Sequence, residues 1–571
     1  MEVSFVPSTV AEHLLGLLGA HGVEHFFLNP GTDSAPLQEA MRTLPEAGVV
    51  IPQVHTSSFE AVSLAAAHGY YQATGRPQCL FVHVDAGTQN LGAMMHNAFR
   101  DRAGVIIIAG RTPYGEDASS RGGRDGYIHW LQDVPDQAGI VRPYTKACID
   151  ITRAETLDRA IGRAVQLATS YPAGPVYLTV SRDVLMDKPV TSASRTKGFA
   201  LPRPPAMDDT SLEEVSGILA SAKRPLLITS RLGRRAEGFT ATTHLAELLG
   251  MEVIRGADCG PVSIPTLHPL HRRAPARSAA AFRGADVILI AECDVPWIPK
   301  LVQPAADAKV LLIDPEPLHP TMPLWAFPID LSVQADGPTA IDQLMRALEA
   351  RAAASPELAA RGSARAAAAF AEPAPGGVPA DPAKMTALDV LQILNEVLLD
   401  EDIAIEEAVT NSGLLYQNLV RRQPATLRGA FAPGLGWALG GALGVKMANP
   451  ERRVVAICGD GSLLFSVPTS ALMMSATIGA PFVTVVLNNG GYRASRLPVY
   501  DLFPEGASAL AADAVGTRFV DAPDFAALAR ACHANGERVE HHGQLLEALR
   551  RALRSVESGT SAIVDVAIHQ N

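Results

Sequence analysis

The amino-acid sequence has few cysteines and no long run of apolar or basic residues. Its six cysteines are scattered over 571 residues without a C-x-x-C pair, a pattern that disfavours both a zinc site and a disulfide framework. No stretch reaches the roughly 18 apolar residues of a membrane span, and the amino terminus lacks a basic region followed by an apolar core. The formal net charge of −11 disfavours a nucleic-acid or anionic-membrane surface. These absences predict a cytoplasmic protein.

Aromatic residues are also scarce, at 5% of a chain that is 47% hydrophobic, so the core must be built mainly from aliphatic side chains. Short β-branched runs recur along the chain, for example over 105–109, 287–291 and 454–458, and helical patterns separate them. Alternation of this kind is typical of βα units with a parallel sheet. The sequence therefore predicts an α/β protein with doubly wound parallel sheets.

Two stretches of biased composition divide the chain into three blocks of comparable size. Residues 188–207 carry four prolines and several Ser/Thr residues, which is typical of a linker. Residues 349–384 are rich in alanine and then in proline and glycine, which indicates a helix followed by a flexible connection. We expect domains over residues 1–187, 208–348 and 385–571.

Two polar motifs of the third block each follow an apolar run. Gly459-Asp460-Gly461 ends one run, and Asn488-Asn489 ends the next, 26 residues later. Open α/β sheets bind ligands at such carboxyl ends of strands. The Asp460 carboxylate, the Asn489 amide oxygen and the Gly491 carbonyl are oxygen ligands of the kind that suits a Mg²⁺ ion already carrying two diphosphate oxygens. Either motif alone is typical of a turn, but together they predict a metal and diphosphate site.

This pattern resembles that of the thiamine diphosphate (ThDP) enzymes. In that family an aspartate, the second asparagine and the carbonyl two residues later hold the metal ion, which implies Asp460, Asn489 and Gly491 as metal ligands here. A second signature lies in the first block. Residues 59–75 predict a helix ended by glycine, and Glu60 stands nine residues before the glycine of a Gly-Tyr pair, the interval of the family's glutamate helix.

The resemblance implies that Glu60 is catalytic and activates the cofactor. A protonated carboxyl bonded to the pyrimidine ring favours the imino form of the aminopyrimidine, which then removes the thiazolium C2 proton. Such a carboxyl needs apolar surroundings, and its neighbours between Phe59 and Leu64 are mostly apolar. A glutamate near a helix start is otherwise only a favourable partner of the helix dipole. The two signatures together favour the activating role.

A glycine-rich segment before the metal motif, 431–439, resembles the family's turn that holds the cofactor in a V shape. Leu435 is the candidate for the bulky residue that props the cofactor, and a plain core leucine is the alternative. The Pro433 carbonyl is the candidate partner of the 4′-amino group. On the resemblance, the cofactor-binding residues are Glu60, Pro433, Leu435, Gly459, Asp460, Gly461, Ser462, Asn489 and Gly491.

Two segments of the first block resemble benzoylformate decarboxylases in particular. They are Leu-Asn-Pro-Gly-Thr-Asp at 28–33 and His-Val-Asp-Ala-Gly-Thr-Gln-Asn at 83–90. The match implies that Asn29, Thr32 and His83 face the substrate and that His83 is a catalytic acid or base. A structural, hydrogen-bonded histidine is the alternative for His83.

Other segments depart from that branch. Residues 293–299 contain no histidine, although benzoylformate decarboxylases place a second active-site histidine there. Pyruvate decarboxylases carry an adjacent histidine pair in the first block. That block has no such pair here, and His541-His542 lies in the third block instead. The segment 489–493 resembles oxalyl-CoA decarboxylases and 2-hydroxyacyl-CoA lyases, and the general layout also suits acetolactate synthase-like proteins.

The central block is predicted to be Rossmann-like, but residues 230–235 after its first strand are not G-x-G-x-x-G, so no dinucleotide site is predicted. Some branches of the family place FAD or ADP against this domain, and the sequence leaves that open. The resemblance also implies that the first block binds the pyrimidine and the third the diphosphate. Glu60 of one subunit would then face Asp460 of the next in a homodimer, and a homotetramer is the usual family state.

We therefore expect a ThDP- and Mg²⁺-dependent enzyme that cleaves or forms a C–C bond beside a carbonyl. The favoured reaction is decarboxylation or carboligation of a small-molecule 2-oxo acid. The alternatives are a 2-hydroxyacyl-CoA lyase or oxalyl-CoA decarboxylase acting on an acyl-CoA, a non-catalytic ThDP-binding regulatory protein, and a nucleotide-dependent oxidoreductase. Glu60 speaks against the regulatory protein, and the missing glycine fingerprint speaks against the oxidoreductase.

Overall fold

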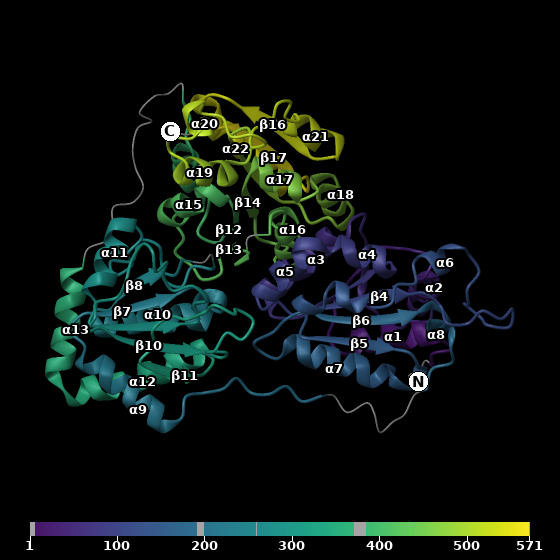
Figure 1. The fold of residues 1–571 in the computed structure, drawn as a ribbon, viewed down its shortest axis with the longest axis horizontal. Coiled ribbons are helices and arrows are strands. Elements are labelled where there is room, and N and C mark those ends of the chain that lie inside the picture. Colours follow the sequence, from purple (N-terminus) through teal and green to yellow (C-terminus); the bar gives the residue numbers. More distant parts are fainter. Residues whose placement is uncertain (1–5, 191–198, 258–259, 370–383, 433, 570–571) are drawn as a thin grey trace.

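The computed structural model describes residues 6–190, 199–257, 260–369, 384–432 and 434–569. It contains three sheets that the chain forms one after another, and every strand pair in them is parallel (Figure 1). The expected α/β fold of three doubly wound parallel-sheet domains is confirmed. Within the described residues, no helix is both long and apolar enough to cross a membrane.

The first sheet has the strand order β2-β1-β3-β4-β6-β5. Its strands are β1 His25–Leu28, β2 Gln53–Thr56, β3 Gln78–Val82, β4 Val105–Arg111, β5 Ala147–Ile151 and β6 Val176–Ser181. Its helices are α1 Val10–Ala20, α2 Ala35–Glu46, α3 Glu60–Thr74, α4 Val84–Asn90, α5 Gly92–Arg100, α6 Ile128–Leu131, α7 Leu157–Thr169 and α8 Arg182–Met186. Helices α1, α2 and α7 pack on one face and α3 and α5 on the other. Strands β3 and β6 are therefore buried along their whole length and carry mostly apolar residues.

The second sheet has the order β11-β10-β9-β7-β8. Its strands are β7 Pro225–Thr229, β8 Glu252–Arg255, β9 Val287–Ala291, β10 Lys309–Asp314 and β11 Leu331–Gln334. Its helices are α9 Asp209–Ser221, α10 Ala236–Leu249, α11 Pro275–Gly284, α12 Gly337–Ala354 and α13 Pro356–Ala368. Helices α9, α10, α12 and α13 contribute to the core on one face, and α11 contributes to the core on the other.

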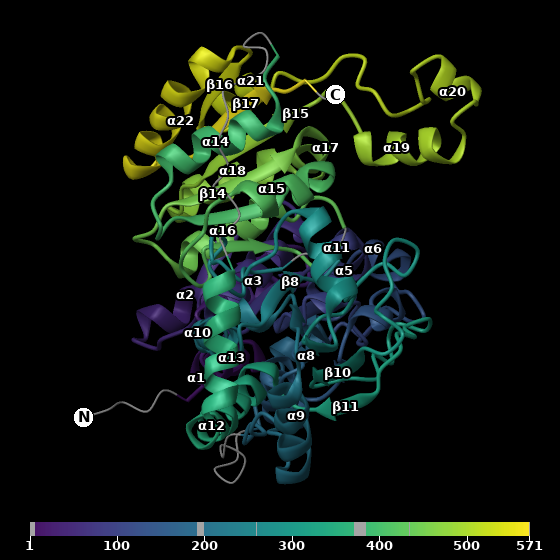
Figure 2. The same cartoon turned by 90° about the vertical axis from the view of Figure 1, so that its left-hand side faces the viewer.

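The third sheet has the order β13-β12-β14-β15-β17-β16. Its strands are β12 Ile403–Glu407, β13 Leu427–Gly429, β14 Val454–Gly459, β15 Val483–Asn488, β16 Asn535–Val539 and β17 Ala562–Ala567. Its helices are α14 Ala387–Val397, α15 Ser412–Asn418, α16 Ala438–Ala448, α17 Asp460–Phe465, α18 Pro468–Ile478, α19 Arg493–Leu502, α20 Ala507–Leu510, α21 Phe525–Ala531 and α22 His542–Glu557. Figure 2 shows α19 and α20 projecting away from the rest of this domain.

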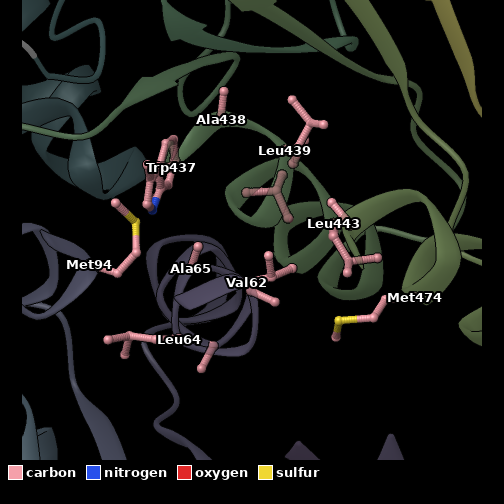
Figure 3. Close-up of a cluster of buried hydrophobic side chains, with 14 of the residues drawn as sticks. Val62, Leu64, Ala65, Met94, Trp437, Ala438, Leu439, Leu443 and Met474 are labelled. Carbon is pink, nitrogen blue, oxygen red and sulfur yellow. The ribbon is translucent and has the colours of Figure 1, made fainter. Parts of the chain in front are cut away.

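The first and third domains share one hydrophobic core, which forms where α3 crosses α16 (Figure 3). The crossing is close because glycines stand at it. A Cβ on Gly444 of α16 would lie 1.9 Å from the carbonyl oxygen of Ala66, and a Cβ on Gly69 of α3 would lie 2.3 Å from the carbonyl oxygen of Gly441. The helix that begins at Glu60 is therefore fixed against the domain that carries the metal motif.

Candidate active site

Asp460 lies where the sequence predicts it, directly after β14 and at the start of α17. Its carboxylate is buried and organises the loop that follows the neighbouring strand β15. Oδ2 accepts hydrogen bonds from the backbone N–H groups of Gly490 (2.7 Å) and Gly491 (2.9 Å), and Oδ1 accepts one from Gly461 (2.9 Å). Burial raises the pKa of Asp460, and these backbone bonds oppose that rise.

The two asparagines at the end of β15 have different surroundings. Asn488 is bound on both sides of its amide: Nδ2 donates to Asp565 at 2.9 Å, and Oδ1 accepts from the Gly490 N–H at 3.1 Å. Asn489 Oδ1 is buried, yet it has no hydrogen-bond partner among the described residues. A buried oxygen without a partner is costly, and a bound cation would satisfy it.

The backbone conformation of Gly491 and the closeness of Thr517 both favour glycine at this position. Its φ of +151° is strained for other residues, and a Cβ there would lie 2.2 Å from the carbonyl oxygen of Thr517. A Cβ on Gly461, in the first turn of α17, would lie 2.8 Å from the ring of Tyr492. The predicted donor set fits Mg²⁺, because the Asp460 carboxylate, the Asn489 amide oxygen and the Gly491 carbonyl are hard oxygen atoms on adjoining loops. The Gly491 carbonyl also accepts the Arg493 N–H at 3.1 Å.

The remaining predicted diphosphate residues lie around this loop pair. Gly459 is the residue before α17, and Ser462 is buried in the first turn of that helix. Leu435 is half-buried in the glycine-rich turn. Pro433 lies outside the described residues.

The turn that carries Leu435 is held by two residues that sequence reasoning missed. Glu407, the last residue of β12, accepts backbone N–H bonds from Gly436 (2.7 Å), Trp437 (3.3 Å) and Ala438 (2.7 Å). Asn97 of α5 exchanges two hydrogen bonds with the backbone of Gly434, one of 2.7 Å and one of 3.1 Å. Asn97 lies 337 positions from its partner, so the order of residues along the chain gives no signal for this contact.

Glu60 is the first residue of α3, and its side chain is almost completely buried, with the residue 9% exposed. Helix α3 and its end at Gly75, which has a left-handed φ of +71°, confirm the helix predicted over 59–75. Asn90 Nδ2 donates to Glu60 Oε2 at 3.1 Å. A Cβ on Gly87 would lie 3.0 Å from Glu60 Oε1, so this glycine leaves the second oxygen its space.

Asn29 supports the same helix. Its Nδ2 donates to the carbonyl of Ser57 at 3.2 Å, and its Oδ1 accepts from the Ser63 hydroxyl at 2.9 Å, one turn after Glu60. Thr32, the second residue predicted to face the substrate, is exposed in the loop after β1. Of these two residues of the segment 28–33, Asn29 is buried and is hydrogen-bonded to α3, whereas Thr32 is exposed.

His83 follows β3 and forms a pair with Asp33, the last residue of the segment 28–33. His83 Nδ1 lies 2.7 Å from Asp33 Oδ1, while Asp33 Oδ2 accepts the backbone N–H of Val84 at 3.2 Å. Two glycines leave room for the pair: a Cβ on Gly31 would lie 2.1 Å from His83 Nδ1, and one on Gly110 would lie 1.5 Å from Asp33 Oδ2. The hydrogen bond to Asp33 raises the pKa of His83. Partial burial lowers this pKa, but the bond and the nearby negative charges outweigh that effect.

The Asp33 carboxylate can only accept a hydrogen bond, so His83 Nδ1 must donate. In neutral His83 the lone pair is therefore on Nε2, which lies 3.3 Å from Gln132 Nε2. This arrangement leaves Nε2 as the atom that takes up or releases a proton near neutral pH. The geometry suits a general acid or base, the role that the sequence predicts.

Ion pairs lie at the carboxyl edge of the central sheet, and they also reach the first domain. Arg102 Nη2 lies 3.2 Å from Asp294 Oδ1 and 3.3 Å from Asp314 Oδ1. Burial alone would raise the pKa of Asp294, but the attraction of Arg231 and Arg102 outweighs it and lowers the pKa to about 2. The members of this network are Arg102, Arg231, Arg234, Glu292, Asp294, Asp314 and Asp336.

Two family models match the chain. The N-terminal TPP-binding domain of the thiamine pyrophosphate enzymes, whose cofactor is ThDP under another name, matches residues 8–140, and the C-terminal TPP-binding domain matches residues 409–566. Two curated relatives are benzoylformate decarboxylase of Pseudomonas aeruginosa and acetolactate synthase of Bacillus subtilis. The first is 26% identical over 499 residues, 84% of this chain and 86% of the relative, and the second is 23% identical over 505 residues, 86% and 83%.

Solved structures share the fold. The 4-hydroxybenzoylformate decarboxylase of Rhodococcus jostii superposes with a TM-score of 0.79 at 20% identity and covers 99% of this chain and 100% of its own. Benzoylformate decarboxylase of Polynucleobacter necessarius has a TM-score of 0.79 at 19% identity, with 99% of each chain covered. At this level of identity the likeness concerns the fold.

Proposed function

The chain belongs to the ThDP-dependent enzymes related to benzoylformate decarboxylase and acetolactate synthase, and from this premise we propose that it uses Mg²⁺ to hold ThDP and acts on a small 2-oxo acid. The observation that carries the Mg²⁺ proposal is the buried Asn489 oxygen, which has no partner among the described residues, on the loop that contacts the Asp460 carboxylate. Both oxygens belong to groups that Mg²⁺ prefers, and both lie at the carboxyl edge of the sheet, where diphosphate ligands are bound in α/β folds.

The favoured reaction is decarboxylation of the 2-oxo acid, with carboligation to a second carbonyl compound as its extension. The relatives named benzoylformate decarboxylase support this choice, as does the Asp33–His83 pair, which supplies a proton-transfer group at the same sheet edge as Glu60. ThDP, when bound, supplies the carbanion that attacks the carbonyl carbon and holds the released electron pair.

The residues of the chain have separable tasks in this scheme. Glu60 would donate a hydrogen bond to the pyrimidine ring through one oxygen, while Asn90 holds its other oxygen in place. His83 exchanges a proton with the substrate through Nε2, with Asp33 fixing the tautomer. Asp460 and Asn489 hold the metal ion. The exposed Thr32 hydroxyl is the group offered to the substrate carboxylate.

A 2-hydroxyacyl-CoA lyase or oxalyl-CoA decarboxylase is the second candidate, supported by the segment 489–493. A nucleotide on the central domain would have to enter the carboxyl edge of that sheet. Paired charges of Arg102, Arg231 and Asp294 occupy part of this edge.

We further infer that the active unit is at least a homodimer. The projecting α19 and α20 segment exposes large apolar side chains that a second copy of the chain would cover, among them Leu502 at 72% exposure and Leu510 at 79%. Light scattering after size exclusion measures the mass directly, and a monomer would contradict this inference.

The reaction is tested by supplying ThDP and Mg²⁺ with benzoylformate, pyruvate, branched 2-oxo acids and 2-hydroxyacyl-CoA thioesters in turn. We expect CO₂ release from a 2-oxo acid that disappears when Asp460 is changed to Ala. Asp513→Ala, an exposed carboxylate of the same domain, serves as the matched control. Turnover of the CoA thioesters alone would favour the second candidate.

A further inference from the structure

A cavity of about 820 Å³ is lined by residues of all three domains, among them residues of β13. Strand β13 lies between the domains in Figure 1. The cavity wall includes the end of α3, the loop after β7, the segment 201–205 and strand β13. It shares no lining residue with the predicted cofactor, metal or substrate residues. The cavity is therefore separate from the candidate active site.

Arg428 of β13 lines this cavity and is a buried cation without a counter-ion among the described residues. The residue is 6% exposed, and no carboxylate of the described residues lies within ion-pair distance of its guanidinium. Nη1 donates to the backbone carbonyl of Gln72 at 2.6 Å, while the buried Nε has no partner in the described chain. Burial, and secondly the charge of Arg452, lowers the pKa of Arg428 to about 10.

A buried charge of this kind is costly unless something compensates for it. Two acids line the cavity: Glu237 is exposed, and Asp101 is already engaged. Its Oδ1 accepts the Phe431 N–H at 2.6 Å, and its Oδ2 lies 2.7 Å from His68 Nε2. Arg102 lines the same cavity, but unlike Arg428 it is paired with two aspartates, Asp294 and Asp314.

Aromatic and proline side chains form the apolar part of the cavity wall. Tyr71, Tyr171 and Phe431 contribute aromatic rings, and prolines of 201–205 add rigid apolar surface. Arg203 and Arg235 also line the cavity, and Arg235 is paired with Asp336. A site with one buried guanidinium that has no carboxylate partner among the described residues, and with aromatic walls, suits a ligand that has an anionic group on a planar body.

We propose that this cavity binds a small organic anion whose carboxylate or phosphate group pairs with Arg428. The alternative is that Arg428 only caps the last turn of α3 through the Gln72 carbonyl, as cations at helix ends do. The two roles differ in what removal of the charge does. A capping arginine stabilises the protein, whereas an uncompensated buried charge costs stability until its ligand binds.

The test compares Arg428→Gln with the wild type and with Arg422→Gln, an exposed arginine paired with Asp400. All three full-length proteins are saturated with ThDP and Mg²⁺, so that the diphosphate site is filled. Phenyl phosphate and benzoate are titrated by calorimetry, and melting temperatures are recorded without and with each probe. The two probes share a planar body and distinguish a phosphate ligand from a carboxylate ligand.

We expect one probe to bind the wild type and Arg422→Gln saturably, and to bind Arg428→Gln at least about tenfold more weakly. Without a probe, Arg428→Gln should melt at the wild-type temperature or above it. Equal affinity of the wild type and Arg428→Gln for the probe would overturn the proposal, as would failure of both probes to bind the wild type at millimolar concentration. A lower melting temperature of Arg428→Gln together with unchanged probe binding would assign the arginine to capping. None of these outcomes depends on which reaction the active site performs.

Discussion

His83 Nδ1 lies 2.7 Å from Asp33 Oδ1, and this contact determines which nitrogen of His83 can exchange a proton. The same bond raises the pKa of His83, because it favours the protonated imidazole. The pair therefore contributes stability that is present below the ordinary histidine pKa and is lost as pH rises through the raised one. Catalysis through neutral His83 has the opposite dependence and weakens as pH falls.

Asp33→Asn should shift the acidic limb of the kcat/KM profile to lower pH, since the substitution lowers the pKa of His83. The charge-assisted bond is worth roughly 1.5–3 kcal/mol, so turnover at the optimum should fall by up to about 100-fold. His83→Ala removes the acid–base group itself. Its turnover should fall by roughly 10²-fold, and the acidic limb of its kcat/KM profile should disappear. Asp136→Asn changes an exposed carboxylate of the same domain and serves as the control. An unshifted limb in Asp33→Asn would remove Asp33 from the mechanism.

Asn489→Ala should weaken Mg²⁺ and ThDP binding by at least about tenfold without lowering the melting temperature of the cofactor-free protein. The reason is that Asn489 Oδ1 has no partner within the described protein to lose. The neighbouring Asn488→Ala is the matched comparison, because it breaks bonds to Asp565 and Gly490 and should cost roughly 1–3 kcal/mol of stability. Calorimetry and thermal unfolding measure the two effects. Unchanged metal affinity in Asn489→Ala would contradict the metal site.

Gly444→Ala should destabilise the shared core of the first and third domains, since the added methyl would lie 1.9 Å from the Ala66 carbonyl oxygen. Overpacking of this kind costs roughly 1–3 kcal/mol. Gly16→Ala in α1 is the control: no atom lies within 4 Å of its added Cβ, and relief of the glycine penalty should stabilise the helix by roughly 0.5–1 kcal/mol. Urea unfolding midpoints of the cofactor-free proteins compare them. Equal midpoints for Gly444→Ala and the wild type would show that the helices can separate without cost.

The sequence predicted the parts of the site that depend on local order along the chain. The metal motif follows two apolar runs, and such runs end at one edge of a parallel sheet, so Asp460 and the loop at Asn489 could be placed together. Helix 59–75 was predictable because small residues and a terminal glycine mark it.

Contacts between distant segments could not be predicted in this way. Asp33 and His83 are 50 positions apart, and Arg428 and Gln72 are 356 apart. Glu407 was missed because it is an ordinary strand-end residue until the turn at 436–438 folds against it. The domain boundaries and the roles of Leu435 and Thr32 stay predictions.

The account as a whole depends on Glu60 as the group that activates the cofactor, and hydrogen–deuterium exchange at C2 of bound ThDP measures that activation directly. Glu60→Gln keeps the size and burial of the side chain, so ThDP affinity should stay within about tenfold, or roughly 1.4 kcal/mol. Exchange at C2 and turnover should both fall by on the order of 10² or more. Exchange in Glu60→Gln as fast as in the wild type, with ThDP bound, would contradict the account.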